Sequence, residues 1–185
     1  MKELNSSGPL ALSADTMMDK TLDECARALD LPGAREVAGR LADNDPAAWR
    51  QFRQTLAEQV ALFLATLDAG IKAVYLYDPD LFGPGIQGGE REQSIPIHLV
   101  VWSLRRTAAL LSLATALNRA LTQEAGIQFG LEAGEHLLDV LVITDDAIEN
   151  RVGFAGLLFR LQRLAPLVWS HSSSREVRGC WPDTC

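Results

Sequence analysis

The chain has 185 residues, of which 48% are hydrophobic and 22% are charged, and its formal net charge is −7. This length and composition are ordinary for one globular domain with its own core, and the negative charge argues against broad, phosphate-driven binding of nucleic acid. No apolar run reaches the roughly 18 residues of a membrane helix, and the start of the chain lacks the apolar core of a secretory signal. With only three cysteines, we expect a cytoplasmic protein with reduced thiols and no membrane contact.

The first 45 residues predict a tail and two short helices. Residues 1–19 are rich in Ser, Gly and other small residues without periodicity, so we expect a mobile tail. A helix is expected over 21–29, with Thr21 as its N-cap, and a second helix over 34–42. Because a tight turn joins the two helices, residues 20–45 resemble the core of a helix-turn-helix unit.

DNA recognition is the less favoured interpretation of this helical pair. Its second helix offers only Arg35 and Arg40 for phosphates or base edges, with Glu36 between them. Residues 20–53 hold six basic and six acidic side chains, so this stretch carries no net positive charge. We therefore expect two packing helices, and we do not expect the protein to bind DNA.

The rest of the chain predicts helices and strands around a small sheet. Asp45 followed by Pro46 is typical of a helix start, and Gly70 predicts the C-terminal cap. Between them, large apolar residues recur at spacings of three and four. The expected elements are a helix at 46–67, strands at 72–77 and 95–101, a helix at 104–124 closed by Gly126, a strand at 137–144, a short helix at 145–149, a helix at 153–169 and a loose tail at 170–185. This order predicts an α/β or α+β protein in which helices flank a small mixed sheet.

Three strand motifs carry a family resemblance. They read K-A-V-Y-L-Y, P-I-H-L-V-V and L-L-D-V-L-V-I-T, and they lie within residues 46–169. In this order they resemble the minimal bacterial form of the polymerase-β-like nucleotidyltransferases. That family has a Gly-Ser turn after the first strand, Asp-apolar-Asp-apolar in the second, and one more acid in the third. The resemblance implies a nucleotidyltransferase-type sheet, with the third acid at Asp139.

The resemblance also implies that most of the family's catalytic groups are replaced. In the family, the three acids hold two Mg²⁺ ions, which require oxygen ligands. Here Pro96 and His98 occupy the places of the two acids on the second strand, so only Asp139 remains. Asp78 and Pro79 stand where the Gly-Ser turn is expected. We therefore expect a degenerate member of the family, with no bound metal and no cofactor.

The loop between the first two strands offers a second candidate site. Its glycines predict either an anion-binding nest or, preferably, a plain surface loop; they are Gly83, Gly85, Gly88 and Gly89. Acids that would have to rebuild a metal site are Asp78, Asp80, Glu90 and Glu92 in the loop, and Asp145 and Asp146 after the third strand. Asp139 is expected to be a buried acid, because its strand is otherwise apolar. His98 is expected to pack in its strand rather than to ligate a metal.

Together these patterns favour a protein that acts by binding and not as an enzyme. We expect it to bind a protein partner, a second copy of the chain or a nucleotide. One alternative is an active, atypical nucleotidyltransferase that uses displaced acids with Mg²⁺ and a nucleotide. The others are a DNA-binding regulator with an N-terminal helix-turn-helix, and a small acidic adaptor or chaperone.

Overall fold

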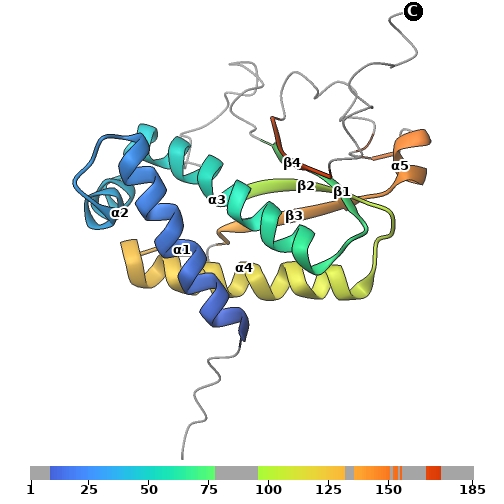
Figure 1. Ribbon diagram of the computed structural model, residues 1–185, viewed down its shortest axis with the longest axis horizontal. Helices are drawn as coiled ribbons and strands as arrows, with labels where there is room; N and C mark the ends of the chain where they lie inside the picture. Colours follow the sequence, from blue (N-terminus) through green and yellow to red (C-terminus); the bar gives the residue numbers. More distant parts are fainter. Residues whose placement is uncertain are drawn as a thin grey trace, which may run out of the picture.

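The computed structural model describes residues 9–77, 96–131, 136–150, 152–153, 155 and 166–171. In Figure 1 these residues form helices packed against a small sheet. The predicted α/β class with a mixed sheet is therefore confirmed. Within the described ranges, no helix combines the length and the apolar character needed to cross a membrane.

The sheet has both antiparallel and parallel pairs among its described strands. These are β1 (Ile71–Tyr77), β2 (Ile97–Ser103), β3 (Leu138–Ile143) and β4 (Leu167–Ser170), in the spatial order β3-β2-β1-β4. β1 is antiparallel to β2 and to β4, whereas β2 is parallel to β3. One row across the sheet runs from Tyr77 through His98 to Asp139. This row lies at one end of the sheet, where β1 ends and where β2 and β3 begin.

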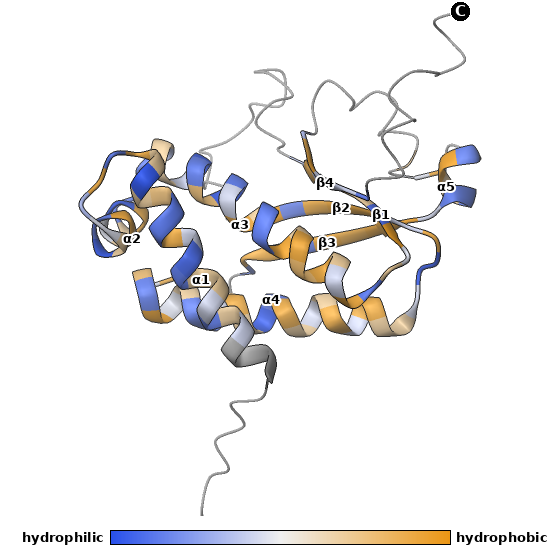
Figure 2. Ribbon diagram, viewed as in Figure 1, coloured by the Kyte–Doolittle hydropathy of each residue, from blue (hydrophilic) through white to orange (hydrophobic). Residues whose placement is uncertain are grey.

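Two long helices cover one face of the sheet, because alternate strand residues are apolar on that side. α3 (Pro46–Leu67) and α4 (Ala108–Phe129) share a core with Ile97, Leu99 and Val101 of β2. Trp49, Phe52 and Phe129 join the two helices through edge-to-face ring contacts, with centroids 5.4 to 5.8 Å apart. In Figure 2 the strands and much of α4 are orange, whereas blue residues are more frequent on α1, on α2 and along α3.

α1 (Pro9–Ala28) crosses both α3 and α4, and α2 (Ala34–Ala42) packs beside it (Figure 1). The predicted start of the first helix is wrong, because α1 begins at Pro9 and residues 9–19 are therefore not a mobile tail. Thr21 is not an N-cap; it is buried inside α1, and its hydroxyl donates to the Met17 carbonyl at 2.7 Å. The first buried positions of α1 are the small Ala14 and the flexible Met17, so in the sequence the N-terminal half of α1 resembles a tail.

Helix ends also differ from the prediction. α3 spans the predicted residues 46–67 and begins as expected, with the Asp45 carboxylate accepting from two backbone amides, but its C-cap residue is Asp68 and not Gly70. The side chain of Asp68 accepts from the Gly70 N–H at 2.8 Å, and Gly70 is not in a left-handed conformation, so it is not the cap. α4 starts after Thr107 and continues past Gly126 to the left-handed Gly130, because Ala125 and Phe129 extend its buried stripe.

The last predicted helix, 153–169, is wrong over its final residues. Leu167–Ser170 is strand β4, which pairs with β1, and Ala155 is helical and buried. The His171 N–H donates to the Lys72 carbonyl at 2.9 Å, and the Leu76 N–H donates to the Pro166 carbonyl at 3.0 Å. Backbone pairing with β1 therefore decides the conformation of this short apolar run. Residues 156–165 and 172–185 lie outside the described residues.

α5 (Asp145–Glu149) follows β3, as predicted, with Thr144 as its N-cap residue. It reaches the sheet face that α3 and α4 do not cover. There Ile148 packs against a small second cluster that contains Val100, Ile143 and Trp102. The second face of the sheet is therefore also apolar at its centre.

Candidate functional site

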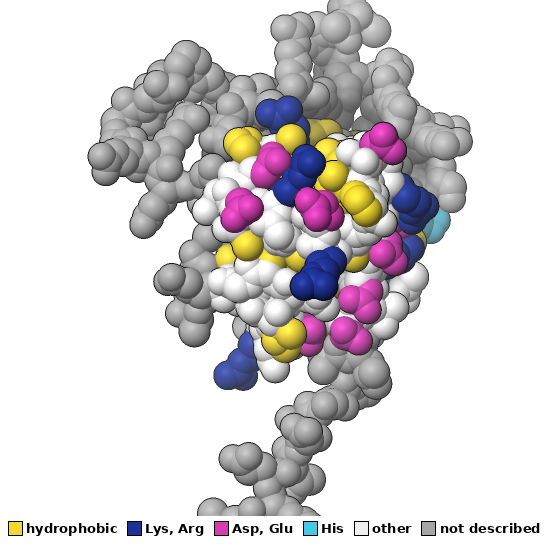
Figure 3. Space-filling model, turned by 90° about the vertical axis from the view of Figure 1, so that its left-hand side faces the viewer, with side chains coloured by type: hydrophobic (Ala, Val, Ile, Leu, Met, Phe, Trp, Pro, Cys, Tyr) yellow, Lys and Arg dark blue, Asp and Glu magenta, His cyan; other side chains and the backbone are white. Residues whose placement is uncertain are grey.

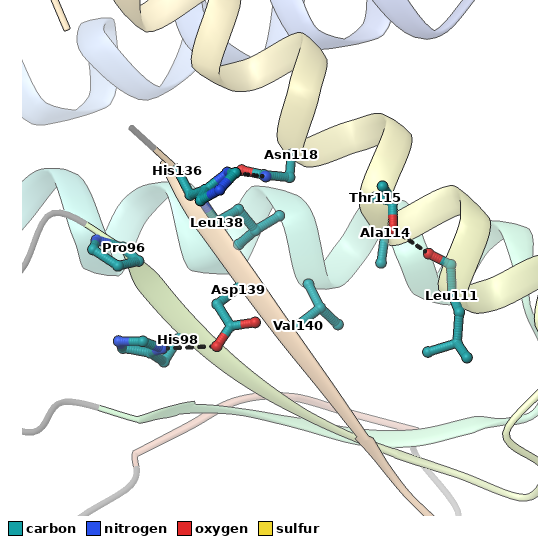
Figure 4. A pocket seen from close by; sticks show the side chains of 10 residues that line it. All are labelled: Pro96, His98, Leu111, Ala114, Thr115, Asn118, His136, Leu138, Asp139 and Val140. Carbon is teal, nitrogen blue, oxygen red and sulfur yellow. Dashed lines mark hydrogen bonds and ion pairs between the residues drawn. The ribbon is translucent and has the colours of Figure 1, made fainter. Parts of the chain in front are cut away.

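A cavity of about 430 Å³ lies between α4 and strand β3. Its polar lining residues are His98, Thr115, Asn118, His136 and Asp139, and its apolar ones are Pro96, Leu111, Ala114, Leu138 and Val140 (Figure 4). Three consecutive residues of β3 line it, although consecutive strand residues point to opposite faces. The cavity therefore runs along the edge of β3, which is an outer strand of the described sheet.

His98 and Asp139 form the polar pair on the strand side of the cavity. They lie opposite each other on the parallel strands β2 and β3, with His98 Nδ1 3.1 Å from Asp139 Oδ2. The His98 ring also meets the ring of Tyr77 edge to face, with centroids 6.0 Å apart. The contact between His98 and Asp139 is drawn in Figure 4.

Asp139 is not the buried acid that its strand sequence predicted. Its side chain is 66% exposed, whereas that of His98 is 27% exposed. The reason is position: Asp139 lies on an outer strand and on the face away from α3 and α4. Its carboxylate is therefore available to whatever enters the cavity. His98 packs within its strand, as expected, but it also contacts the acid.

Asn118 of α4 fixes the start of β3 from the helix side. Its Oδ1 accepts from the Leu138 N–H at 2.9 Å and from the Thr122 hydroxyl at 3.2 Å. The Thr122 oxygen in turn accepts from the Leu137 N–H at 3.1 Å. Asn118 Nδ2 lies 3.3 Å from His136 Nδ1. These bonds set where Asp139, the next residue of β3, faces His98.

A second carboxylate cluster lies at the other end of the strands. Lys72 Nζ is 2.8 and 2.6 Å from the two oxygens of Asp145, and Trp102 Nε1 donates to Asp145 Oδ1 at 2.6 Å. The Lys72 ammonium also lies 5.2 Å from the centre of the Trp102 ring. Burial raises the pKa of Asp145, but the hydrogen bonds from Lys72 and Trp102 and the charge of Lys72 outweigh it, so this pKa lies below its ordinary value.

The structure brings together three of the residues that the sequence singled out. Pro96, His98 and Asp139 line one cavity. Asp145, one of the acids considered for a displaced metal site, is instead engaged by Lys72 and Trp102. The other motif and loop residues, Asp78, Pro79, Asp80, Gly83, Gly85, Gly88, Gly89, Glu90 and Glu92, lie outside the described residues.

Metal and nucleophile chemistry find no support in the described part of the chain. Within the described ranges, no group of three or more His, Cys, Asp or Glu side chains is placed to hold a metal ion. Cys25 is buried in α1, and burial raises the pKa of its thiol to about 11, so it is not a reactive nucleophile. What the cavity offers is hydrogen bonding from imidazole, amide, hydroxyl and carboxylate groups.

Sequence reasoning missed Asn118, His136 and Thr115. The available signal was a polar residue beside the buried stripe of an otherwise apolar helix, as Asn118 is beside Leu117 and Leu121. His136 directly precedes the third strand, but it showed no metal-ligand spacing. Neither signal reveals that the two side chains meet, because the contact joins residues from different elements.

The helical end of the molecule carries charges of both signs. In Figure 3, acidic and basic side chains are interspersed over the upper part of this end, and several acidic side chains lie close together below them. On α2, Arg40 Nη1 lies 3.6 Å from Asp45 Oδ2, whereas Arg35 is exposed. One of the two basic residues available for DNA is therefore paired with an acid. The DNA-binding alternative stays a prediction that duplex titration would test.

No protein-family model, curated protein or solved structure matches the chain. The resemblance to nucleotidyltransferases therefore rests on the three strand motifs and on the positions of Pro96, His98 and Asp139. The cavity geometry stands independently of that resemblance, because it depends only on contacts between described residues.

Proposed function

We propose that the protein binds a small ligand in the cavity between α4 and β3, without a metal ion and without transferring a nucleotide. The observation that carries this proposal is the convergence of Pro96, His98 and Asp139 on one cavity. If these positions are equivalent to the family's metal-binding acids, an imidazole now stands beside the single remaining carboxylate. The protein is then a nucleotidyltransferase-like fold adapted to binding.

The chemistry of the cavity favours binding over metal-dependent transfer. Mg²⁺ needs several oxygen ligands in near-octahedral geometry, and one carboxylate paired with a histidine does not supply them. A triphosphate without metal would need cationic side chains, but none of the described lining residues is Lys or Arg. The cavity volume lies within the range of about 300 to 1,000 Å³ that is typical of small-molecule sites.

Restoring the family's acids tests both parts of the proposal. The double variant Pro96→Asp/His98→Asp would place three carboxylates on the cavity wall, and we expect it to bind Mn²⁺ in a calorimetric titration. The wild-type protein should show no such binding. The variant Pro96→Asn/His98→Asn is nearly isosteric with the double Asp variant but uncharged, so it is the matched control. Circular dichroism checks that each variant folds.

The outcomes separate the two parts. A folded double variant that binds Mn²⁺ no better than its Asn control would contradict the equivalence of these positions with the family's acids. Wild-type protein that transfers a nucleotidyl group with Mg²⁺, and loses this activity in Asp139→Asn, would overturn the proposal in favour of the active alternative.

Association with a protein partner or with a second copy of the chain stays a prediction. Several large hydrophobic side chains of the described residues are exposed, among them Leu62, Leu67 and Leu104. Single exposed apolar side chains are ordinary on protein surfaces, so they favour no particular partner. Light scattering over a range of concentrations would measure self-association directly.

A further inference from the structure

The outer edge of β3 carries backbone groups that no described strand pairs. β3 is the last strand in the described order β3-β2-β1-β4, so it pairs with β2 on one side only. The Ile97 N–H donates to the Leu137 carbonyl, and from Leu137 onwards every second residue therefore directs its backbone groups towards β2. The residues between them, Leu138, Val140 and Val142, direct their N–H and C=O groups outwards.

Most of these outward groups are left open. The Leu138 N–H donates to Asn118 Oδ1 at 2.9 Å, so a side chain of α4 covers the first of them. The outward N–H groups of Val140 and Val142 have no acceptor among the described residues. A row of unpaired N–H and C=O groups on an outer strand is ready to pair with another extended chain.

α4 forms a floor beside this edge. It packs on β3, whereas α3 packs on β1 and β4. One stripe of α4, with members three and four residues apart, lines the cavity: Leu111, Ala114, Thr115 and Asn118. In Figure 4 Leu138 and Val140 point towards this stripe, whereas Asp139 points to the other side of the strand. The cavity is therefore a groove with the edge of β3 as its wall and α4 as its floor.

We propose that the ligand of this groove is a short peptide in extended conformation, which adds to β3 as an antiparallel strand. This inference rests on the proposed ligand-binding function and names its ligand class. The peptide residue opposite Val140 would exchange both backbone hydrogen bonds with it. In such strand addition the main chain supplies affinity, and side chains at alternate positions supply specificity.

The alternation of side chains predicts the peptide's sequence pattern. Peptide residues opposite Val142 and Val140 would point towards α4, where Leu111 and Ala114 favour apolar side chains. The residue opposite Asp139 would lie beside a carboxylate whose side chain is 66% exposed. The chain has a net charge of −7, and none of the described lining residues is Lys or Arg, so a basic side chain is complementary there. The pattern is apolar, any, apolar, basic.

A second copy of β3 is a poorer occupant of the groove. β3 reads L-D-V-L-V-I, so a second copy would add another carboxylate and no basic side chain. A copy related by two-fold symmetry would also bring a second α4 towards the first, because α4 lies beside the edge that would have to pair. A single peptide strand has neither problem.

Three peptides test the pairing. The first, acetyl-Val-Thr-Val-Lys-Val-amide, follows the pattern, and the second has Glu in place of Lys. The third carries an N-methyl group on the nitrogen of its third residue, which removes the donor to the Val140 carbonyl. We expect the first peptide to shift the backbone amide signals of Val140 and Val142 in a ¹H–¹⁵N titration. The N-methylated peptide should bind at least about tenfold more weakly, and the Glu peptide about fivefold more weakly.

The two controls decide different parts of the proposal. Equal binding of the N-methylated peptide would overturn strand addition. Equal binding of the Glu peptide would overturn the basic position opposite Asp139. The variant Asp139→Asn checks the same position from the protein side, because it should bind the Lys and Glu peptides equally well. A preference for Lys that persists in this variant would contradict the assigned pairing.

Two arginine variants of α4 test where the peptide lies. Thr115→Arg places a long cationic side chain in the groove, and we expect it to weaken binding of the Lys peptide at least about tenfold. Ser112→Arg is the matched control, because Ser112 is exposed on the same helix but does not line the cavity. It should bind as the wild type does, and circular dichroism checks that both variants fold. Equal effects of the two substitutions would contradict binding in the groove.

Two further outcomes concern the other occupants. Shifts of Val140 and Val142 that grow with the concentration of the free protein, and that Thr115→Arg abolishes, would make a second copy the occupant and overturn the peptide. Benzamide, a fragment too small to form a strand, separates this inference from the proposed function. If benzamide shifts the Leu138 and Val140 signals but no peptide does, this inference fails and the ligand-binding function stands. If neither benzamide nor any peptide shifts them at millimolar concentration, the ligand-binding function is overturned as well.

Discussion

Two carboxylates at opposite ends of the same strands are held in different ways. Asp139 faces His98 where β2 and β3 begin. Asp145 follows the end of β3 and contacts Lys72 and Trp102. His98 and Trp102 are four residues apart on β2, so the two clusters lie about 13 Å apart along the strand. Both clusters join a carboxylate to nitrogen donors on neighbouring strands.

The difference between them is how fully the carboxylate is satisfied. Asp145 receives three short contacts from two donors, and its side chain is 39% exposed. Asp139 has one contact with a described residue and is 66% exposed at a cavity. A carboxylate with its acceptor sites occupied stabilises the fold and has little left to offer a ligand. We infer that the Asp145 cluster serves stability and the Asp139 pair serves binding.

The largest expected effect is a difference in stability between two alanine variants. Asp145→Ala leaves a half-buried Lys72 ammonium and the Trp102 N–H without their acceptor. The free energy of unfolding should therefore fall by about 2 kcal/mol. Asp139→Ala removes one exposed contact and should change stability by no more than about 0.5 kcal/mol. Urea denaturation measures both values. Equal losses would mean that Asp139 also serves stability.

Asn118 is the second largest expected contributor, because it anchors the strand that carries Asp139. Asn118→Ala leaves the Leu138 N–H without its side-chain acceptor, and we expect the free energy of unfolding to fall by about 1.5 kcal/mol. Asn118→Asp keeps that acceptor and is the matched control, with a smaller loss in urea denaturation. If both variants are equally unstable, the donor to His136, and not the acceptor for β3, is the stabilising group.

The sequence predicted the parts of the fold whose periodicity is carried by large apolar residues. α3, with Trp49 and Phe52 facing inward, and the central strands β1 and β2 are of this kind. The N-terminal half of α1 escaped prediction because its buried positions include Ala14. β4 escaped because a short apolar run fits a helix or a strand equally well, and pairing with β1 makes the choice.

Only part of the candidate site was accessible from the sequence. Pro96, His98 and Asp139 came from a family resemblance, which gives strand positions and therefore neighbours across a sheet. Asn118 and His136 could not be predicted, because their contact depends on how α4 lies against the start of β3. The exposure of Asp139 could not be predicted either, since strand order makes β3 an outer strand of the described sheet.

The pH dependence of stability offers a third test, with an effect of about 1 kcal/mol after allowance for solvent screening. The pKa of Asp145 is lowered from 3.8, so ionised Asp145 stabilises the fold above about pH 4. This stabilisation is lost as the pH falls below 3.8 towards the lower pKa of the folded state. The stability difference between wild type and Asp145→Asn should therefore shrink in acid. A difference that stays constant from pH 6 to pH 2 would contradict the lowered pKa.

The smallest expected effect tests whether the two clusters are independent. Trp102→Phe keeps an aromatic ring beside Lys72 but removes the N–H that donates to Asp145, and it should cost about 0.7 kcal/mol in urea denaturation. Because the cavity is about 13 Å away along β2, the backbone amide signals of Leu138 and Val140 should keep their wild-type positions in an ¹H–¹⁵N spectrum. Shifts at these two amides would show that the Trp102 end of the strands influences the cavity. The division of the two carboxylates into a stabilising and a binding one would then fail, since a change in the first would act on the second.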